Sequence, residues 1–445
     1  MLAKFINWMK PLPDAQRIIT DEKQIVKQYK SWRIKMFSGM FIGYLVFYLN
    51  RKNLSAVSPY IVDQIGVMGY AALGSAMAVT YGIGKFFSGI FTDKCNIKAF
   101  MAFGLICSSV IGLFFGFLTS APLMMFFRGL SGAFQSMGFP PTAKGVVYWF
   151  SQNERGTIWT LISASKTLGA TLILWIASLC VFAGDWRAVF YIPAILGIVC
   201  GIVMLLTMTD KPSTIGLPPV EVFRNDITVT KKKEVNFSQW QLLKKYVFTN
   251  SYLWFVAIGA MFLYYVRFTT LDWAIKFMVD TGLSRASAPS LLAFMPVAGV
   301  LGGVSAGWMS DKFFKGRCVP ISLIYLVFLL GSIYCMYHFI TIKASYLAMA
   351  MSLSAVGFFL EGPQSVAMGV LVTRITLQES VGAAIGFVGI FEYAGTFLAG
   401  LGAGMILLNY SWPGVFSSCS VAVLVTMVLI SLIFKKDAQG YDEKL

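Results

Sequence analysis

The stretch Tyr44-Leu-Val-Phe-Tyr48-Leu-Asn-Arg51-Lys52 places an arginine deep inside the first long apolar segment of the chain. The same Tyr-x-x-Arg pattern returns as Tyr264-Tyr265-Val-Arg267, about half of the 445 residues later and inside another apolar segment. An arginine at the centre of a bilayer costs about 3 kcal/mol or more, so intramembrane charge indicates function by default. Two arginines at matching depth predict a shared role in two related halves.

Composition indicates a polytopic, all-α membrane protein. The chain is 57% hydrophobic with a mean hydropathy of +0.71, and its charged residues, 13% of the total, cluster between apolar runs. A soluble domain would hold fewer apolar residues. The net charge of +16 is explained by lysines and arginines in loops on one side of the membrane, so we predict no binding to nucleic acid.

Run lengths and breaks predict twelve transmembrane helices. The predicted limits are 34–62, 68–92, 98–119, 122–148, 157–183, 187–208, 250–276, 286–310, 318–339, 343–372, 380–408 and 412–434. Lysine and arginine concentrate in the connections that follow even-numbered spans, which predicts cytoplasmic N- and C-termini.

These spans divide the chain into five predicted segments. Two six-helix halves, 34–208 and 250–434, flank a cytoplasmic linker at 209–249, whose prolines and lysines favour a flexible connection. A cytoplasmic N-terminal segment, 1–33, and a cytoplasmic tail, 435–445, complete the chain. The segment 1–33 has no cleavable signal-peptide pattern, and we expect a monomer surrounded by membrane lipid.

The two halves repeat one another in sequence. Gly89-Ile-Phe-Thr-Asp93-Lys94 follows the second span, and Gly307-Trp-Met-Ser-Asp311-Lys312 follows the eighth at a matching interval. Such repeats place a substrate site near the membrane midplane, at the interface of the halves. The acid of each loop sits at a helix junction, where it can cap a neighbouring helix, so we interpret all four charged residues as a conformational device.

Several motifs in order resemble one known family, the organophosphate:phosphate antiporters of the major facilitator superfamily, which include bacterial glycerol-3-phosphate and hexose-phosphate carriers. The hexose-phosphate (glucose-6-phosphate) transporter and sensor type looks most similar. The resemblance covers residues 30–434 and rests on Phe47-Tyr48-Leu49-Asn50-Arg51-Lys52-Asn53, Tyr81-Gly82-Ile83-Gly84-Lys85-Phe86, Trp149-Phe150-Ser151-Gln152-Asn153-Glu154-Arg155-Gly156, Tyr265-Val266-Arg267 with Leu271-Asp272-Trp273, and Gly307-Trp308-Met309-Ser310-Asp311-Lys312.

The paired arginines are the main candidates for binding a phosphate group. Guanidinium is permanently charged and bonds phosphate through two donors, so Arg51 and Arg267 match a dianionic phosphate monoester or inorganic phosphate. Tyr48 and Tyr264 lie one turn away and can donate to phosphate oxygens. The alternative is that each arginine pairs with a buried carboxylate and only joins helices. The resemblance implies a substrate-attracting role for Lys85, although snorkelling to the interface is also open.

Lys166 departs from part of the family. The stretch Ser163-Ala-Ser-Lys166-Thr-Leu-Gly169 matches a position where glycerol-phosphate carriers have a histidine. A lysine stays charged where a histidine titrates near neutral pH. This third cation therefore favours a different phosphate ester, or a lysine neutralised by a carboxylate.

Acidic residues in the later spans have several readings. Glu361 and Glu392 are expensive to bury unless they are paired, so they form gating salt bridges with Lys85, Lys166 or other neighbours. Alternatively, Glu392 with Gln364 or Tyr393 accepts hydrogen bonds from sugar hydroxyls, or one carboxylate carries a proton. Asp272, about one turn beyond Arg267, either orients that arginine or closes an outer gate.

We therefore predict a twelve-helix antiporter of the major facilitator fold in the bacterial inner membrane. It exchanges a sugar phosphate, a hexose 6-phosphate such as glucose 6-phosphate, for inorganic phosphate by alternating access. The alternatives are glycerol-3-phosphate exchange, proton symport and a membrane sensor for sugar phosphate. An enzyme is not expected, because the single histidine, His338, and the seven cysteines supply no triad or metal cluster. We predict no cofactor and no metal.

Overall fold

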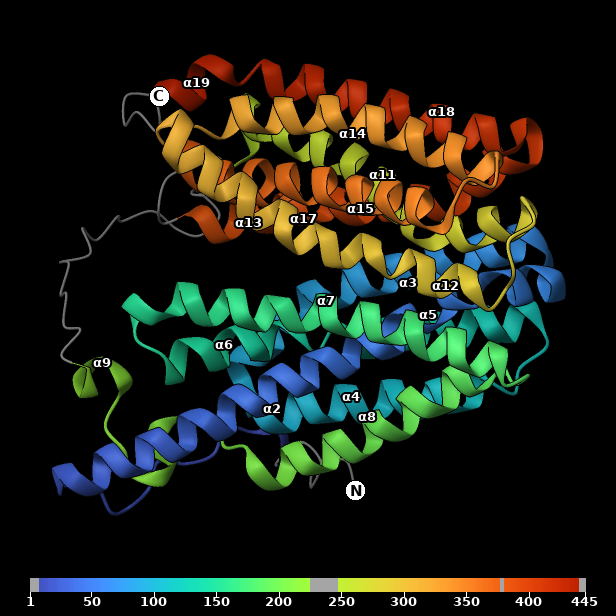
Figure 1. Ribbon diagram of the computed structural model, residues 1–445. Helices are drawn as coiled ribbons and strands as arrows, with labels where there is room; N and C mark the ends of the chain where they lie inside the picture. The colour runs from blue at the N-terminus through green and yellow to red at the C-terminus, as the bar shows by residue number, and fades with distance from the viewer. Residues whose placement is uncertain (1–7, 225–246, 377–379, 440–445) are drawn as a thin grey trace. The chain divides into compact units, whose positions relative to one another are not determined.

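The computed structural model describes residues 8–224, 247–376 and 380–439, apart from the side chains of Asp93 and a few others. Every regular element in these ranges is helical (Figure 1). The first half contains α2 (Glu22–Ala56), α3 (Ser58–Lys94), α4 (Ile97–Phe115), α5 (Ala121–Gln135), α6 (Phe139–Trp149), α7 (Gln152–Phe182) and α8 (Ala188–Thr207). Two short elements follow, η1 (Pro212–Ile215) and α9 (Val220–Phe223).

The second half is built in the same way. Its helices are α11 (Ser251–Asp280), α12 (Ser287–Leu292), α13 (Phe294–Phe314), α14 (Cys318–Thr341), α15 (Tyr346–Ser365), η3 (Val366–Val370), α16 (Leu371–Ile375), α17 (Val381–Phe397), η5 (Leu398–Gly402), α18 (Ala403–Ser431) and α19 (Phe434–Gln439). The elements η3 and η5 are π-helical insertions in longer helices.

These helices account for the twelve predicted spans. Nine described stretches are long and apolar enough to cross a membrane, and one of them, 383–431, covers the predicted spans eleven and twelve. A non-helical backbone at Ser411 separates those two spans. The first predicted span corresponds to α2 and the fourth to α5 with α6.

The first two spans differ from their predicted limits. Helix α2 begins at Glu22, well before residue 34, and ends at Ala56 rather than 62. The residues after Ser58 already belong to α3, which bends at Gly66. The φ angle of Gly66 is 76°, a value that side chains disfavour, so this glycine provides the break, which lies between the predicted limits of the two spans at 62 and 68.

The fourth and tenth predicted spans are interrupted rather than continuous. Helix α5 ends at Gln135, and α6 starts at Phe139 with a proline in its first turn. In the tenth span, Pro363 lies inside α15 just before the π-helical turn η3. Proline has no backbone N–H and clashes with the preceding turn, so each break follows from the local sequence.

The chain separates into two compact units. The first contains residues 1–53, 80–173 and 187–233, and the second contains 54–79, 174–186 and 234–445. Within the first unit, α4 packs along α8 and beside α5; within the second, α13 packs along α15, and α11 packs against α17 and α18 (Figure 1). A Cβ added at Gly197 of α8 would lie 2.0 Å from Oγ of Ser109, so α4 and α8 require this glycine.

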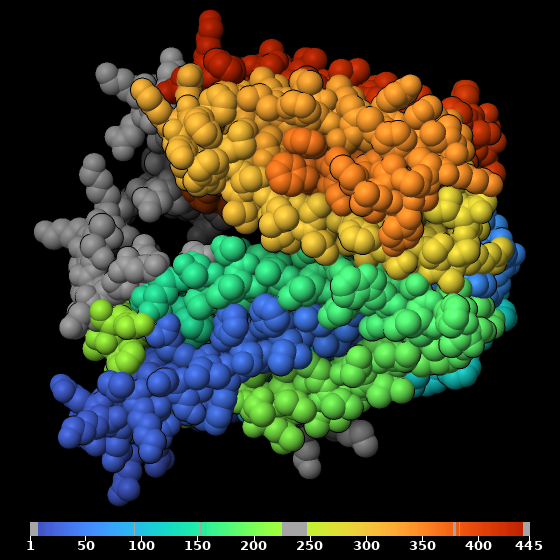
Figure 2. All heavy atoms as spheres, in the orientation of Figure 1, coloured from blue at the N-terminus to red at the C-terminus, as the bar shows by residue number. Residues whose placement is uncertain are grey.

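Apolar side chains cover the outer face of the first unit. Helix α8 runs along its surface in Figure 2, and its exposed residues are Ile192, Ile195, Leu196, Val199, Ile202, Val203 and Leu206. In water such a face would be unfavourable, whereas hydrocarbon tails solvate it without cost. A face of this composition is suited to contact with lipid.

Segments of the first sequence half that belong to the second unit pack on C-terminal helices. The hydroxyl of Tyr70 in α3 donates to the backbone oxygen of Asp272 at 2.6 Å. Asp63 of α3 forms a 2.7 Å ion pair with Arg285, which follows α11. These contacts fasten the first part of α3 to the start of the C-terminal half.

A buried carboxylate holds the start of the third span in the first unit. Asp210, which follows α8, accepts hydrogen bonds from the backbone N–H of Ile97 at 3.1 Å and from that of Leu12 at 3.3 Å. Burial raises the pKa of Asp210, and these two N–H donors act in the opposite direction. Residues 209–224 of the predicted linker therefore fold against the first unit. The segment 225–246 lies outside the described residues, so its flexibility stays a prediction.

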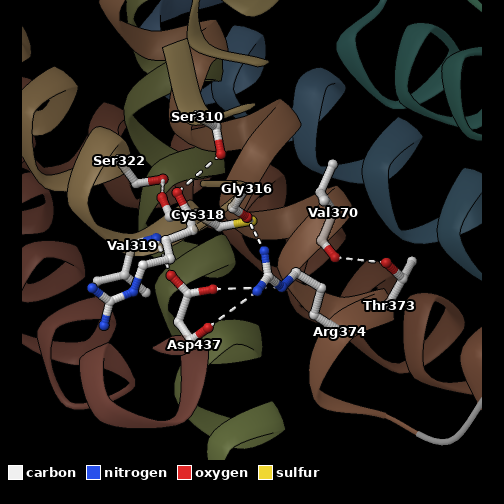
Figure 3. Close-up of polar contacts among 10 residues, drawn as sticks. Ser310, Gly316, Cys318, Val319, Ser322, Val370, Thr373, Arg374 and Asp437 are labelled. Atoms are coloured by element: carbon white, nitrogen blue, oxygen red, sulfur yellow. Dashed lines mark hydrogen bonds and ion pairs between the residues drawn. The ribbon is translucent and has the colours of Figure 1, made fainter. Parts of the chain in front are cut away.

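The second unit repeats this arrangement with Asp437 of α19. Its carboxylate accepts from the backbone N–H of Val319, the start of the ninth span, at 2.8 Å. Arg374 lies beside it, with Nε 3.8 Å from the carboxylate, and donates to the carbonyl oxygen of Gly316 (Figure 3). Each unit thus uses an aspartate beyond its sixth span to cap its third span.

We expect the substitution Asp437→Ala to lower stability by about 1–3 kcal/mol, because it leaves the N–H of Val319 without its acceptor and removes the carboxylate beside Arg374. Thermal unfolding of the purified protein in detergent measures this as a lower apparent Tm. The matched control is Asp14→Ala, since Asp14 pairs with Lys211 at the exposed surface, where an ion pair contributes little. An equal Tm in both variants would contradict the capping role.

Candidate functional site

Arg51 is contacted by an amide and two aromatic rings of its own unit. Its Nε donates to Oε1 of Gln135 at 2.9 Å, and its guanidinium carbon lies 4.6 Å and 4.1 Å from the ring centres of Tyr48 and Tyr81. Gln135 is completely buried. An amide orients the guanidinium without cancelling its charge, and the aromatic faces stabilise a cation further.

The break between α5 and α6 positions this amide. Gln135 is the last residue of α5, and the chain then turns through Gly138. A Cβ on Gly138 would lie 3.0 Å from the ring of Phe47, so α2 and the turn approach closely at this point. The sequence Gly-Phe-Pro-Pro therefore brings the end of α5 to the level of Arg51.

The first unit holds two further predicted cations. Lys85, one turn after Tyr81 on α3, is half-buried with Nζ 5.0 Å from the ring centre of Phe139. Lys166 is half-buried on α7, three residues before Gly169 and hence on the same face. A Cβ on Gly169 would lie 2.9 Å from Cβ of Tyr48, so this face of α7 packs against α2 beside that tyrosine.

Arg267 of α11 meets a carboxylate instead. Its Nη1 donates to both Oε2 of Glu361 and Oε1 of Gln364 on α15. The Nε2 of Gln364 in turn donates to the hydroxyl of Tyr264 at 2.9 Å. Within this unit, Arg267 therefore pairs with a carboxylate, and Glu361 has an arginine as a partner.

The two arginines share one construction. Each lies on the first helix of its half, and the fourth helix of the same half holds its guanidinium. The difference is in charge, because Gln135 is neutral whereas Glu361 is an anion with a side chain only 18% exposed. The guanidinium of Arg51 is thus oriented by an amide, whereas that of Arg267 is partly neutralised.

The other predicted residues of the second unit are half-buried on two helices. Glu392 and Tyr393 lie on α17, and Asp272 lies on α11. The backbone oxygen of Asp272 accepts from Tyr70, which ties this turn to α3. The predicted roles of these three side chains stay predictions.

The described residues of the two charged loops lie at the ends of helices. Asp311 and Lys312 are exposed at the end of α13, where Nζ of Lys312 lies 4.7 Å from a ring centre of Trp308. Lys94 is exposed at the end of α3, and the side chain of Asp93 lies outside the described residues. The conformational role of these loops stays a prediction.

Sequence reasoning missed three residues around Arg51. Tyr81 was visible only as part of a motif, and Gln135 had no distinguishing pattern. Arg128 of α5 is 7% exposed and donates from Nη2 to the backbone oxygen of Arg51 at 2.8 Å. Arg128 carried the same signal that singled out Arg51, since it lies inside a predicted span.

Comparison with known proteins connects this geometry to a family. The model of the Major Facilitator Superfamily matches residues 40–360 and 306–444. A solved structure of a bacterial homologue of the human lysosomal transporter Spinster is 15% identical to this chain, with a TM-score of 0.67. The match covers 92% of this chain and 96% of that one. This likeness supports the fold alone.

Curated relatives are more similar in sequence. A "Probable hexose phosphate transport protein" of Chlamydia muridarum is 32% identical over 443 residues, 96% of each chain. The "Membrane sensor protein UhpC" of Salmonella typhimurium is 32% identical over 422 residues, 93% of this chain and 94% of that one. The apolar helices and these bacterial relatives show that the chain is a multi-pass inner-membrane protein and not an enzyme. The chain therefore belongs to the organophosphate:phosphate antiporter family of the major facilitator superfamily.

Proposed function

We propose that this protein is a secondary transporter that exchanges a hexose 6-phosphate, such as glucose 6-phosphate, for inorganic phosphate by alternating access. The observation that carries the proposal is the pair of intramembrane arginines, each oriented by the fourth helix of its half. Guanidinium in a low-dielectric site binds phosphate oxygens through paired, charge-assisted hydrogen bonds. The N- and C-termini face the cytoplasm in this proposal, in accord with the positive-inside rule.

The predicted binding residues of the two units differ in charge. We propose that this difference sets the orientation of the bound substrate. Arg51, Lys85 and Lys166 are cations of the first unit, whereas the predicted binding residues of the second unit include Glu361 and Glu392. In our proposal the phosphate group binds mainly to the cations. The carboxylates, with Gln364 and Tyr393, accept hydrogen bonds from the sugar hydroxyls.

In this proposal, the ion pair between Arg267 and Glu361 explains why one anion is exchanged for another. Without ligand, Glu361 occupies a donor of this guanidinium. A phosphate that binds Arg267 competes with Glu361, and the released carboxylate becomes an acceptor for a hydroxyl. Because Arg267 and Glu361 are each costly to bury without a partner, Glu361 returns as phosphate leaves, and their ion pair then holds the empty carrier until another anion competes for Arg267. Binding of either anion thus controls movement of the halves.

The second candidate is a membrane receptor for external sugar phosphate. It is favoured by the similarity to a protein named as a membrane sensor. Both functions use the same binding chemistry, and only flux separates them. Glycerol 3-phosphate is the alternative substrate, and Lys166 argues against it because the glycerol-phosphate carriers that this chain resembles have a histidine at the matching position.

Proteoliposomes loaded with unlabelled phosphate test the transport proposal. We expect uptake of labelled phosphate, stronger competition from glucose 6-phosphate than from glycerol 3-phosphate, and loss of exchange in Arg51→Lys and Arg267→Lys, because lysine cannot make a bidentate bond. Vesicles loaded with chloride are the control for leakage. Binding of sugar phosphate without any exchange of phosphate would support the receptor instead, and stronger competition from glycerol 3-phosphate would reassign the substrate.

Exchanging the charges of the arginine partners tests the proposed competition. The substitution Gln135→Glu places a carboxylate on Arg51, and we expect about 10-fold weaker phosphate binding. Glu361→Gln removes the competitor of Arg267, and we expect tighter binding with a lower maximal exchange rate, because release becomes slower. Equilibrium binding of labelled phosphate and exchange kinetics measure the two quantities.

The matched control is Glu154→Gln, which makes the same chemical change at a carboxylate that pairs with Arg33 and Arg224. It should leave phosphate affinity unchanged. If Glu361→Gln weakens binding, Glu361 is a ligand for the substrate rather than a competitor of phosphate, and the exchange mechanism described above is wrong.

A further inference from the structure

Arg128 is a buried charge inside a predicted span that the proposed phosphate site does not use. Its side chain belongs to α5, and the residue is only 7% exposed. A guanidinium at this depth is expensive unless it is bonded and has a role. Its contacts therefore indicate what the protein gains from keeping it.

The contact that defines Arg128 is with the backbone of Arg51. Nη2 donates to the carbonyl oxygen of Arg51 at 2.8 Å. Helix α2 ends a short distance later, at Ala56, and carries no basic residue in its last turn. A cation near the carbonyl end of a helix is stabilised by the aligned peptide dipoles. Arg128, on α5, therefore supplies the cation that the last turn of α2 does not contain.

Arg128 and Gln135 act on the same residue from one helix. They are seven positions, or two turns, apart on α5 and therefore lie on one face. Arg128 bonds the carbonyl of Arg51, and Gln135 bonds its Nε at 2.9 Å. Ser131, between them, accepts from Nε2 of Gln135 at 3.5 Å. One polar face of α5 thus contacts both the main chain and the side chain of Arg51.

These contacts fix where the guanidinium of Arg51 lies along α2 and how it is oriented. The bond to the main chain fixes the register of α2 against α5, and the bond to Nε fixes the plane of the guanidinium. A shift of 1 Å in a binding group can lose much of a geometry-dependent interaction. Without the main-chain bond, Gln135 would have to position Arg51 from α5 through its side chain alone.

We propose that Arg128 is a positioning residue of the phosphate site, which acts through Arg51. The proposal rests on the proposed function of Arg51 as a phosphate ligand. It assigns Arg128 no direct contact with the substrate. Its removal should therefore weaken phosphate binding only as far as Arg51 depends on it.

A double-mutant cycle measured as binding of labelled inorganic phosphate to the purified full-length protein tests this role. The cycle compares wild type, Arg128→Gln, Arg51→Lys and the double variant. We expect Arg128→Gln to weaken binding about 10-fold, and the double variant to bind no more weakly than Arg51→Lys alone. Arg128→Lys, which retains the charge and one donor, should recover most of the affinity. A merely structural residue would lower the folded fraction without changing the Kd of what remains.

The outcomes separate this inference from the proposed function. Normal phosphate affinity in Arg128→Gln, or losses that multiply in the double variant, overturns the positioning role alone. A wild-type protein that binds neither phosphate nor a sugar phosphate overturns the proposed function and this inference with it. If Arg128→Gln does not fold, Arg128→Met, of similar length, replaces it in the cycle with the same expected loss.

Discussion

The cost of a guanidinium in a medium of low dielectric constant organises both units of this protein. Each donor of a buried arginine needs an acceptor, and water is too scarce inside the membrane to supply it. Both units meet this need by pairing their first helix with their fourth, through Arg51 with Gln135 and Arg267 with Glu361. The register of these helix pairs is therefore set by polar contacts in a core where apolar packing alone discriminates poorly.

The helix interruptions belong to the same arrangement. Gln135 is the last residue of α5, and Gln364 lies one residue before the end of α15, where the π-helical turn begins. Proline near each break removes a backbone N–H and redirects the helix that follows. Gln135 and Gln364 thus each lie next to a helix break. In each half, the break divides a span that looks continuous when judged by the length of its apolar run.

Duplication extends to parts of the chain where the sequence repeat is not visible. Asp210 and Asp437 both cap the third span of their unit, yet the residues around them are unrelated. Asp210 is joined by the N-terminal segment, and Asp437 by Arg374. A contact made by one carboxylate and one helix terminus needs no longer motif. Sequence comparison of the halves could not detect it.

The amino-acid sequence by itself determined the membrane class, the twelve spans, the two-fold repeat and the two arginines, because run length, loop charge and an intramembrane cation are properties of the chain alone. Only the tertiary structure decided the partners of those arginines. Gln135, Glu361 and Arg128 each lie far along the chain from the residue they bond, and a helix shows no preferred face when all its sides are apolar. The physical reason is that hydrogen bonds between helices depend on rotation and register, and these are set only when the helices pack together.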